Sequence, residues 1–180
     1  MELTQQKQKT AFDVLKADFG YQNVMAAPHI EKVVVSVGTG KRAKTDKRWN
    51  DHVADRLTKI TGQAPSLRQA KKSIAQFKIR TGDQIGLTTT LRGEKALSFF
   101  DKLIHVALPR TRDFRGIAAT GVDEMGNLTI GVKEHTIFPA TADEDLNDVF
   151  GLSVTVVTTA SSKEEARAFF DYLGVPCKKD

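Results

Sequence analysis

The sequence contains a single cysteine, Cys177, among its 180 residues. One thiol cannot form an intramolecular disulfide, which favours a reducing compartment and predicts a cytoplasmic protein. Long apolar runs are also missing, because none approaches the roughly 20 residues that cross a bilayer. The first residues lack the apolar core of a secretory signal. We therefore expect neither secretion nor a membrane partner.

Side-chain groupings that would indicate catalysis or metal binding are equally scarce. The 4 histidines are far apart in the sequence, and none has the spacing of a metal-ligand pair. Cys177 has no adjacent histidine that could activate its thiol. The sequence thus predicts a protein that is not an enzyme and has no metal site and no cofactor. One alternative to this interpretation is open.

That alternative is a small nucleotide-binding enzyme that uses the loop Gly38-Thr39-Gly40-Lys41. Gly38, Gly40 and Ala43 loosely match a dinucleotide-binding loop after a valine-rich strand. Against it, the expected helix begins too late, and the Gly-Lys-Ser/Thr ending of a Walker loop is absent. On the other interpretation the glycines form a turn that lets RNA approach the backbone closely.

Negative charge is scarce in the middle of the chain. The net charge is +5, but residues 41–115 hold 18 basic and 7 acidic side chains, whereas residues 116–180 hold 5 and 11. This asymmetry indicates an anionic partner for the middle third, most simply nucleic acid. The acidic final third faces either a basic partner or solvent.

The rest of the composition is that of an ordinary globular domain, with 40% apolar and 27% charged residues. No repeat or linker divides it, so we expect one domain over residues 1–180. Apolar spacing predicts helices at 11–19, 49–60, 96–107 and 162–173. Strand-like runs lie at 30–37, 73–80, 84–92, 128–133 and 152–159. The fold class is therefore α+β, with a mostly antiparallel or mixed sheet, helices packed on one face and a protruding basic loop.

One side of this sheet is expected to be small and polar. The run 84–92 alternates between a mostly apolar side and a side that includes Thr88 and Thr90. Another run places Lys32 and Ser36 together on one side. Short hydroxyls and flanking cations suit an RNA backbone. An ordinary solvated sheet face has the same pattern, and the alternation alone does not separate the two.

Basic side chains gather in three segments. Residues 63–82 contain no acidic side chain and interleave cations with Ile74 and Phe77, which fits an extended hairpin aimed at RNA. A second basic cluster, 41–48, follows the glycine turn. The third holds Arg110, Arg112 and Arg115. These arginines either bind phosphate, or Asp113 pairs with one of them and fixes the loop.

Several sequence blocks, matching in order along essentially the whole chain, closely resemble the bacterial large-subunit ribosomal protein five family. The blocks are Pro28-His29-Ile30-Glu31-Lys32-Val33-Val34-Val35, Ala70-Lys71-Lys72-Ser73-Ile74-Ala75-Gln76-Phe77-Lys78-Ile79-Arg80, Thr90-Leu91-Arg92-Gly93-Glu94, Leu108-Pro109-Arg110-Thr111-Arg112-Asp113-Phe114-Arg115-Gly116 and Val157-Thr158-Thr159-Ala160. The resemblance implies a monomer within the ribosome that contacts large-subunit rRNA and attaches 5S rRNA in the central protuberance. It also implies contact with peptidyl-site tRNA and a bridge to small-subunit protein thirteen.

The resemblance also implies which residues carry these contacts. Together with Lys32 from the sheet pattern, the 5S rRNA set is Met25, Pro28, Lys32, Ser36, Gly38, Gly40, Thr88, Thr90 and Arg92. The tRNA-contacting loop is Lys71, Lys72, Ser73, Ile74, Ala75, Gln76, Phe77, Lys78 and Arg80. Arg110, Arg112 and Arg115 are candidates for RNA or bridge contacts. The family usually has Asn where Ser36 stands, and serine has a shorter reach.

Overall fold

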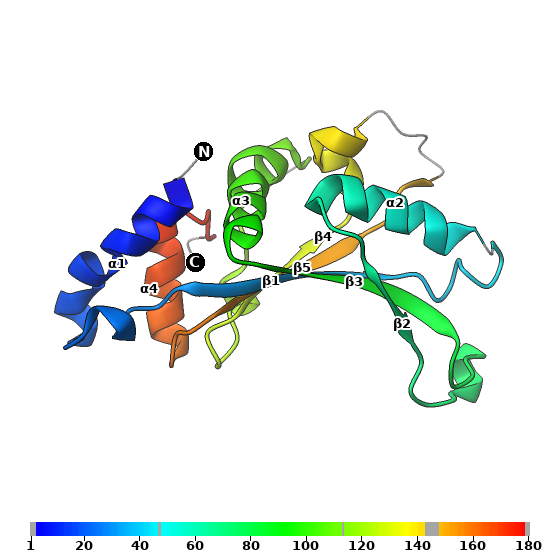
Figure 1. The fold of residues 1–180 in the computed structure, drawn as a ribbon, viewed down its shortest axis with the longest axis horizontal. Coiled ribbons are helices and arrows are strands. Elements are labelled where there is room, and N and C mark those ends of the chain that lie inside the picture. The colour runs from blue at the N-terminus through cyan, green and yellow to red at the C-terminus, as the bar shows by residue number, and fades with distance from the viewer. Residues whose placement is uncertain (1–2, 47, 113, 143–147, 179–180) are drawn as a thin grey trace. The chain divides into compact units, whose positions relative to one another are not determined.

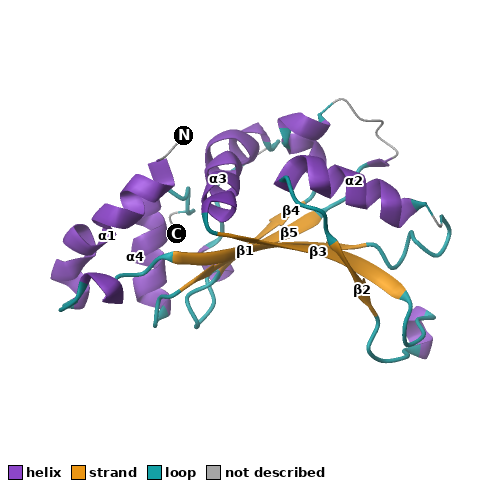
Figure 2. Ribbon diagram, viewed as in Figure 1, coloured by secondary structure: helices purple, strands orange, loops and turns teal. Residues whose placement is uncertain are grey.

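The computed structural model describes residues 3–46, 48–112, 114–142 and 148–178. It is an α+β fold around an antiparallel sheet with the strand order β2-β3-β1-β5-β4 (Figure 1). The strands are β1 Ile30–Gly38, β2 Ser66–Gln69, β3 Gln84–Arg92, β4 Leu128–Val132 and β5 Leu152–Thr158. The α-helices, purple in Figure 2, are α1 Leu3–Phe19, α2 Trp49–Thr61, α3 Glu94–Lys102 and α4 Lys163–Leu173. The predicted fold class is confirmed.

The chain divides into two compact units. Unit 1 comprises Met1–Val33, Leu91–Ile130 and Val154–Asp180, and unit 2 comprises Val34–Thr90 and Gly131–Ser153. Four of the strands contribute residues to both units. The expectation of a single domain stays a prediction.

Unit 1 is built on three helices, because α1 contacts both α3 and α4. Leu15 of α1, Phe100 of α3 and Phe169 of α4 are buried. Apolar burial of this kind is the main stabilising term for such a helix group. The buried carboxylate of Asp101 accepts a hydrogen bond from the hydroxyl of Thr4, which provides the partner that a buried charge requires.

The start of α4 is capped by side-chain hydrogen bonds around the N-cap residue Ser162. Ser162 Oγ accepts a hydrogen bond from the Glu165 amide at 3.2 Å, and Glu165 Oε2 accepts one from the Ser161 amide at 2.7 Å. The helix ends at Gly174, whose φ of 92° is the left-handed conformation that stops a helix. The predicted helix at 162–173 is therefore confirmed.

The third predicted helix, 96–107, is only partly regular. After α3 the chain widens into a π-turn at Leu103–Ala107 and then tightens into a 3-10 turn at Leu108–Arg110. Pro109 cannot continue the helix because it lacks an amide hydrogen. Leu103, Ala107 and Leu108, which lie in these turns, are all buried.

Unit 2 packs α2 through a single apolar stripe. Val53, Leu57 and Ile60 are fully buried, and Gly62 ends the helix at a φ of 70°. At the other end of α2, the ring of Trp49 meets the edge of Phe150 at 6.3 Å between centroids. The predicted helix at 49–60 is confirmed.

The predicted strand at 73–80 is wrong. The strand of this region is β2, whose 4 residues are all exposed and pair with β3 in an antiparallel register. Residues 70–83 connect β2 to β3 as a hairpin with a 3-10 turn at Ala75–Phe77. The hairpin's alternation of apolar and basic residues resembles a strand, but its side chains are largely exposed, so packing does not hold an extended chain.

Among the described residues no helix is long and apolar enough to cross a membrane.

Candidate nucleic-acid interface

In unit 2, β3 presents the predicted polar row. Thr88 and Thr90 are half-buried and alternate with Leu87 and Thr89, which are buried. This alternation places the hydroxyls of Thr88 and Thr90 on the accessible side of the strand. Ser36 of β1 is also half-buried. The face expected from the sequence therefore exists within this unit.

Two glycines bring β1 and the turn after it close to β3. A Cβ on Gly86 would lie 2.8 Å from the carbonyl oxygen of Val37, so only glycine fits there. The amides of Thr39 and Gly40 donate to Ile85 O at 2.9 and 3.0 Å. These bonds fix the turn after the exposed Gly38 beside the start of β3.

Gln63 belongs to the same region, although sequence reasoning did not single it out. Its side-chain Nε2 donates to the carbonyl oxygen of Thr90 at 3.1 Å, and its backbone amide donates to Thr61 Oγ1 at 3.3 Å. Gln63 therefore lies beside the polar row of β3. It begins the acid-free segment, but nothing in its sequence spacing could have indicated this neighbour.

In unit 1, two predicted RNA-contacting cations share one carboxylate. Glu31 Oε1 accepts hydrogen bonds from Lys32 Nζ at 3.4 Å and from Arg92 Nη1 at 3.3 Å. The Lys32 ammonium, and then the Arg92 guanidinium, lower the pKa of the Glu31 carboxyl below its ordinary value. Glu31 is a further member of this surface that sequence reasoning missed.

Two other members of the predicted 5S rRNA set differ sharply in exposure. Met25 is 86% exposed on a 3-10 turn, where Asn23 Oδ1 accepts a hydrogen bond from its amide at 3.0 Å. Pro28 is buried. A buried proline can act on RNA only by shaping the turn that precedes β1.

The third basic segment also lies in unit 1. Arg110 ends a 3-10 turn, and the side chains of Arg110, Arg112 and Arg115 are all exposed. The alternative in which Asp113 pairs with one of them lies outside the described residues. Exposed guanidinium groups remain available to phosphate or to an acidic protein surface.

The hairpin of residues 70–83 is closed at its base and at its tip. At the base, the Ala70 amide donates to Asp83 O at 2.8 Å and the Gly82 amide donates to Ala70 O at 3.0 Å. Near the tip, Ile74 and Ile79 exchange amide hydrogen bonds of 2.9 and 3.2 Å. All nine residues of the predicted tRNA-contacting loop are exposed.

The basic segment 41–48 makes contacts within the protein that the sequence did not predict. The Arg42 guanidinium lies 3.7 Å from the ring centroid of Trp49 and pairs with Asp148 at 3.3 Å. Lys44 Nζ donates to the carbonyl oxygens of Phe77 and Lys78. At least two of these cations therefore have structural partners.

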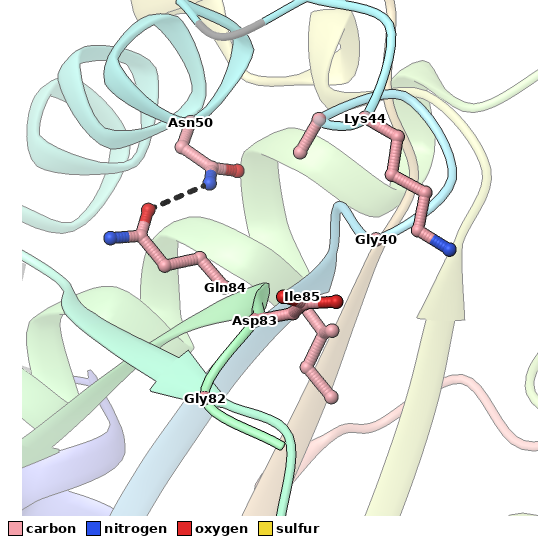
Figure 3. A pocket seen from close by; sticks show the side chains of 8 residues that line it. Gly40, Lys44, Asn50, Gly82, Asp83, Gln84 and Ile85 are labelled. Carbon is pink, nitrogen blue, oxygen red and sulfur yellow. Dashed lines mark hydrogen bonds between the residues drawn. The ribbon is translucent and has the colours of Figure 1, made fainter. Parts of the chain in front are cut away.

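A cavity of about 480 Å³ lies between the glycine turn and the base of the hairpin. Figure 3 shows Asn50 Nδ2 donating to Gln84 Oε1 beside it, at 3.2 Å, with Gly40 and Lys44 on another wall. α2 begins only at Trp49, so the glycines do not lead directly into a helix N-terminus. The phosphate-binding geometry that the nucleotide alternative requires is therefore not built here.

Comparison with known proteins identifies one family along almost the whole chain. A family model described as "Ribosomal protein L5" matches residues 23–80, and a second model, for the C-terminus of the same ribosomal family, matches residues 84–177. The "Large ribosomal subunit protein uL5" of Flavobacterium johnsoniae is 46% identical over 178 residues, which is 99% of this chain and 97% of that protein. The protein of the same name from a Thermoanaerobacter species is 42% identical over 177 residues, 98% of each chain.

These matches define the class as a ribosomal protein with a structural, non-enzymatic role. The chain belongs to the ribosomal protein L5 family. The prediction that the chain is not an enzyme is confirmed, and the nucleotide-binding enzyme based on Gly38 and Gly40 is set aside.

Proposed function

We propose that this chain, a structural constituent of the large ribosomal subunit, binds 5S rRNA and attaches it in the central protuberance. It works in the cytoplasmic ribosome, in contact with large-subunit rRNA. The observation that carries the proposal is the accessible row of Thr88 and Thr90 beside Ser36 in unit 2. Short hydroxyls donate to phosphate or to a ribose 2′-OH without holding the RNA backbone away from the sheet.

Unit 1 supplies charge to the same function. Lys32 and Arg92 are the cations expected to neutralise phosphates, and both are reachable, since Arg92 is exposed and Lys32 half-buried. Met25 adds a large exposed apolar side chain that can pack on a ribose or a base. Phosphate neutralisation would make binding salt-dependent.

The hairpin contacts peptidyl-site tRNA in this proposal. Phe77 is 62% and Ile74 45% exposed, beside several lysines and without an acidic side chain between residues 63 and 82. Exposed apolar groups among cations suit a nucleic acid, since the cations meet phosphates while the apolar groups pack on sugars or bases. The exposed ring of Phe77 supports a nucleic-acid partner for this loop.

The bridge to small-subunit protein thirteen rests on the resemblance and on charge. Residues 116–180 hold 11 acidic and 5 basic side chains, which suits a basic neighbour. Arg110, Arg112 and Arg115 are the other candidates, and they would take an acidic surface or RNA instead.

Binding to purified RNA tests the 5S rRNA proposal. Affinity for 5S rRNA should exceed that for tRNA and for a random RNA of the same length at physiological salt. The log of the affinity should fall with log salt by a slope of roughly 0.7 to 0.9 per neutralised phosphate. Equal affinities and equal slopes for all three RNAs would contradict specific binding.

A further inference from the structure

Lys44 makes a contact that the proposed function does not use. Its ammonium donates hydrogen bonds to two consecutive backbone carbonyl oxygens at the hairpin tip, those of Phe77 and Lys78, at 2.5 and 2.8 Å. These partners lie 33 and 34 residues further along the chain. Hydrogen bonds from a charged donor are stronger than neutral ones. The contact therefore ties segment 39–46 to the hairpin tip.

The carbonyl of Lys78 belongs to a strained residue. Lys78 has φ 51° and ψ 41°, and among the described residues it is the non-glycine residue with a positive φ. For a residue with a Cβ, this left-handed backbone conformation costs free energy, so surrounding contacts must stabilise it. The Lys78 amide donates to Ala75 O at 3.0 Å, and its carbonyl accepts from Lys44. Both polar groups of the strained residue are thereby engaged.

Segment 39–46 is itself fixed to the body of unit 2. The Gly40 amide donates to Ile85 O at 3.0 Å, and Arg42 lies over the ring of Trp49 and pairs with Asp148. Trp49 is only 4% exposed, so this anchor is part of the core. Lys44 therefore extends from a fixed segment to an otherwise exposed tip.

We propose that Lys44 is a positioning residue, which holds the hairpin tip in the conformation that contacts RNA. Because the tip is ordered before binding, less conformational entropy is lost when Phe77 and Ile74 meet their partner. Lys44 acts through the backbone of Phe77 and Lys78, and not by its charge alone. The RNA part of this inference rests on the proposed function, whereas its structural part concerns the protein by itself.

Amide hydrogen exchange of the full chain tests the structural part. Lys44→Met keeps an unbranched side chain that is one atom shorter and removes the donors, so the amides of Ile74 and Ile79 should exchange roughly tenfold faster. The amides of Ala70 and Gly82 at the hairpin base should not change. Lys41→Met is the matched control, because Lys41 is exposed in the same segment and carries the same charge.

The conservative variant separates hydrogen bonding from charge and packing. Lys44→Arg also places several N–H donors near the two carbonyls and should restore slow exchange at Ile74 and Ile79. Unchanged exchange at the tip of Lys44→Met would overturn the inference. So would an equal acceleration at the base, which would indicate general loss of stability.

Affinity for tRNA in assembled ribosomes tests the functional part. Lys44→Met should weaken it by roughly three- to tenfold, while Lys44→Arg stays near wild type. Faster tip exchange without any loss of tRNA affinity would contradict the RNA role of the hairpin and leave the structural role of Lys44 intact. Loss of affinity with unchanged exchange would contradict the positioning role.

Discussion

Arg92 Nη1 donates a hydrogen bond of 3.3 Å to Glu31 Oε1. Because the same oxygen accepts from Lys32 Nζ, two cations expected to meet 5S rRNA are already held by one carboxylate. All three side chains lie at the surface, where an ion pair contributes little to folding and where water and salt screen it. If Lys32 and Arg92 contact 5S rRNA as proposed, Glu31 competes with phosphate for both cations.

Removing that competitor should tighten RNA binding. We expect Glu31→Gln to raise affinity for 5S rRNA by roughly two- to fivefold at low salt, with a smaller gain at high salt because screening weakens the charge terms. A fluorescence titration at several salt concentrations measures both. Glu94→Gln changes the net charge equally at another exposed site. An equal gain in both variants, or weaker binding in Glu31→Gln, would contradict the shared-carboxylate account.

The hydroxyl row of β3 should affect affinity without affecting salt dependence. Thr88→Val and Thr90→Val keep the side-chain shape and remove one donor each, so each should weaken 5S rRNA binding by roughly fivefold, about 1 kcal/mol. Arg92→Gln should instead reduce the salt slope, since it removes a phosphate contact. Valine variants that bind as tightly as the wild type would show that the β3 row is an ordinary solvated face.

The close approach of β3 to β1 should make Gly86 a stability determinant. Gly86→Ala would place its Cβ 2.8 Å from Val37 O, and we expect a loss of about 1–3 kcal/mol in the free energy of unfolding. Gly38→Ala is the control, because no atom lies within 4 Å of the added Cβ. Urea unfolding measures both variants. Equal midpoints would refute the steric argument.

The turn around Asp123 should give a pH-dependent term. Hydrogen bonds from the side chain and amide of Asn127 lower the pKa of the Asp123 carboxyl below its ordinary value. The charged form therefore stabilises the fold above the ordinary pKa, about 3.9, and this stabilisation is lost as the pH falls through the lowered value. Asp123→Ala should lower the urea midpoint at neutral pH, and its difference from the wild type should shrink on acidification. Glu124→Ala, an exposed neighbour, should show no such trend.

The lysines before the hairpin tip should separate the two RNA partners. Lys71→Ala combined with Lys72→Ala removes two exposed charges, which should weaken tRNA contact in assembled ribosomes and leave 5S rRNA binding nearly intact. Filter binding and tRNA occupancy measure the two effects. An equal loss of both would contradict this division of labour.

Local sequence signals predicted α2 and α4 closely, missed the first eight residues of α1 and wrongly made residues 73–80 a strand. The apolar stripe of α2, the glycine stop at Gly62 and the N-cap Ser162 of α4 each depend on residues close together in the sequence, so spacing reveals them. The run 73–80 has the composition of a strand, but its residues find no partner strand over most of their length. Because these side chains are exposed, packing does not hold the run extended. A local alternation of apolar and basic residues does not predict that exposure.

The sequence did not predict the contacts between residues far apart in the chain. Arg92 meets Glu31 across 61 residues, and Lys44 meets Phe77 across 33. These contacts depend on strand register and on the course of the segment after β1, which no single spacing encodes. The predicted polar row of β3 required only a period of two and was present as expected.

A crosslinking map of the purified protein on 5S rRNA tests the central claim most directly. We expect crosslinks at residues 25–40 and 88–92 and none at residues 71–80, because in the proposed function the polar sheet face and its turns bind 5S rRNA while the hairpin binds tRNA. Crosslinks concentrated on residues 71–80, with the strands left unmodified, would contradict it.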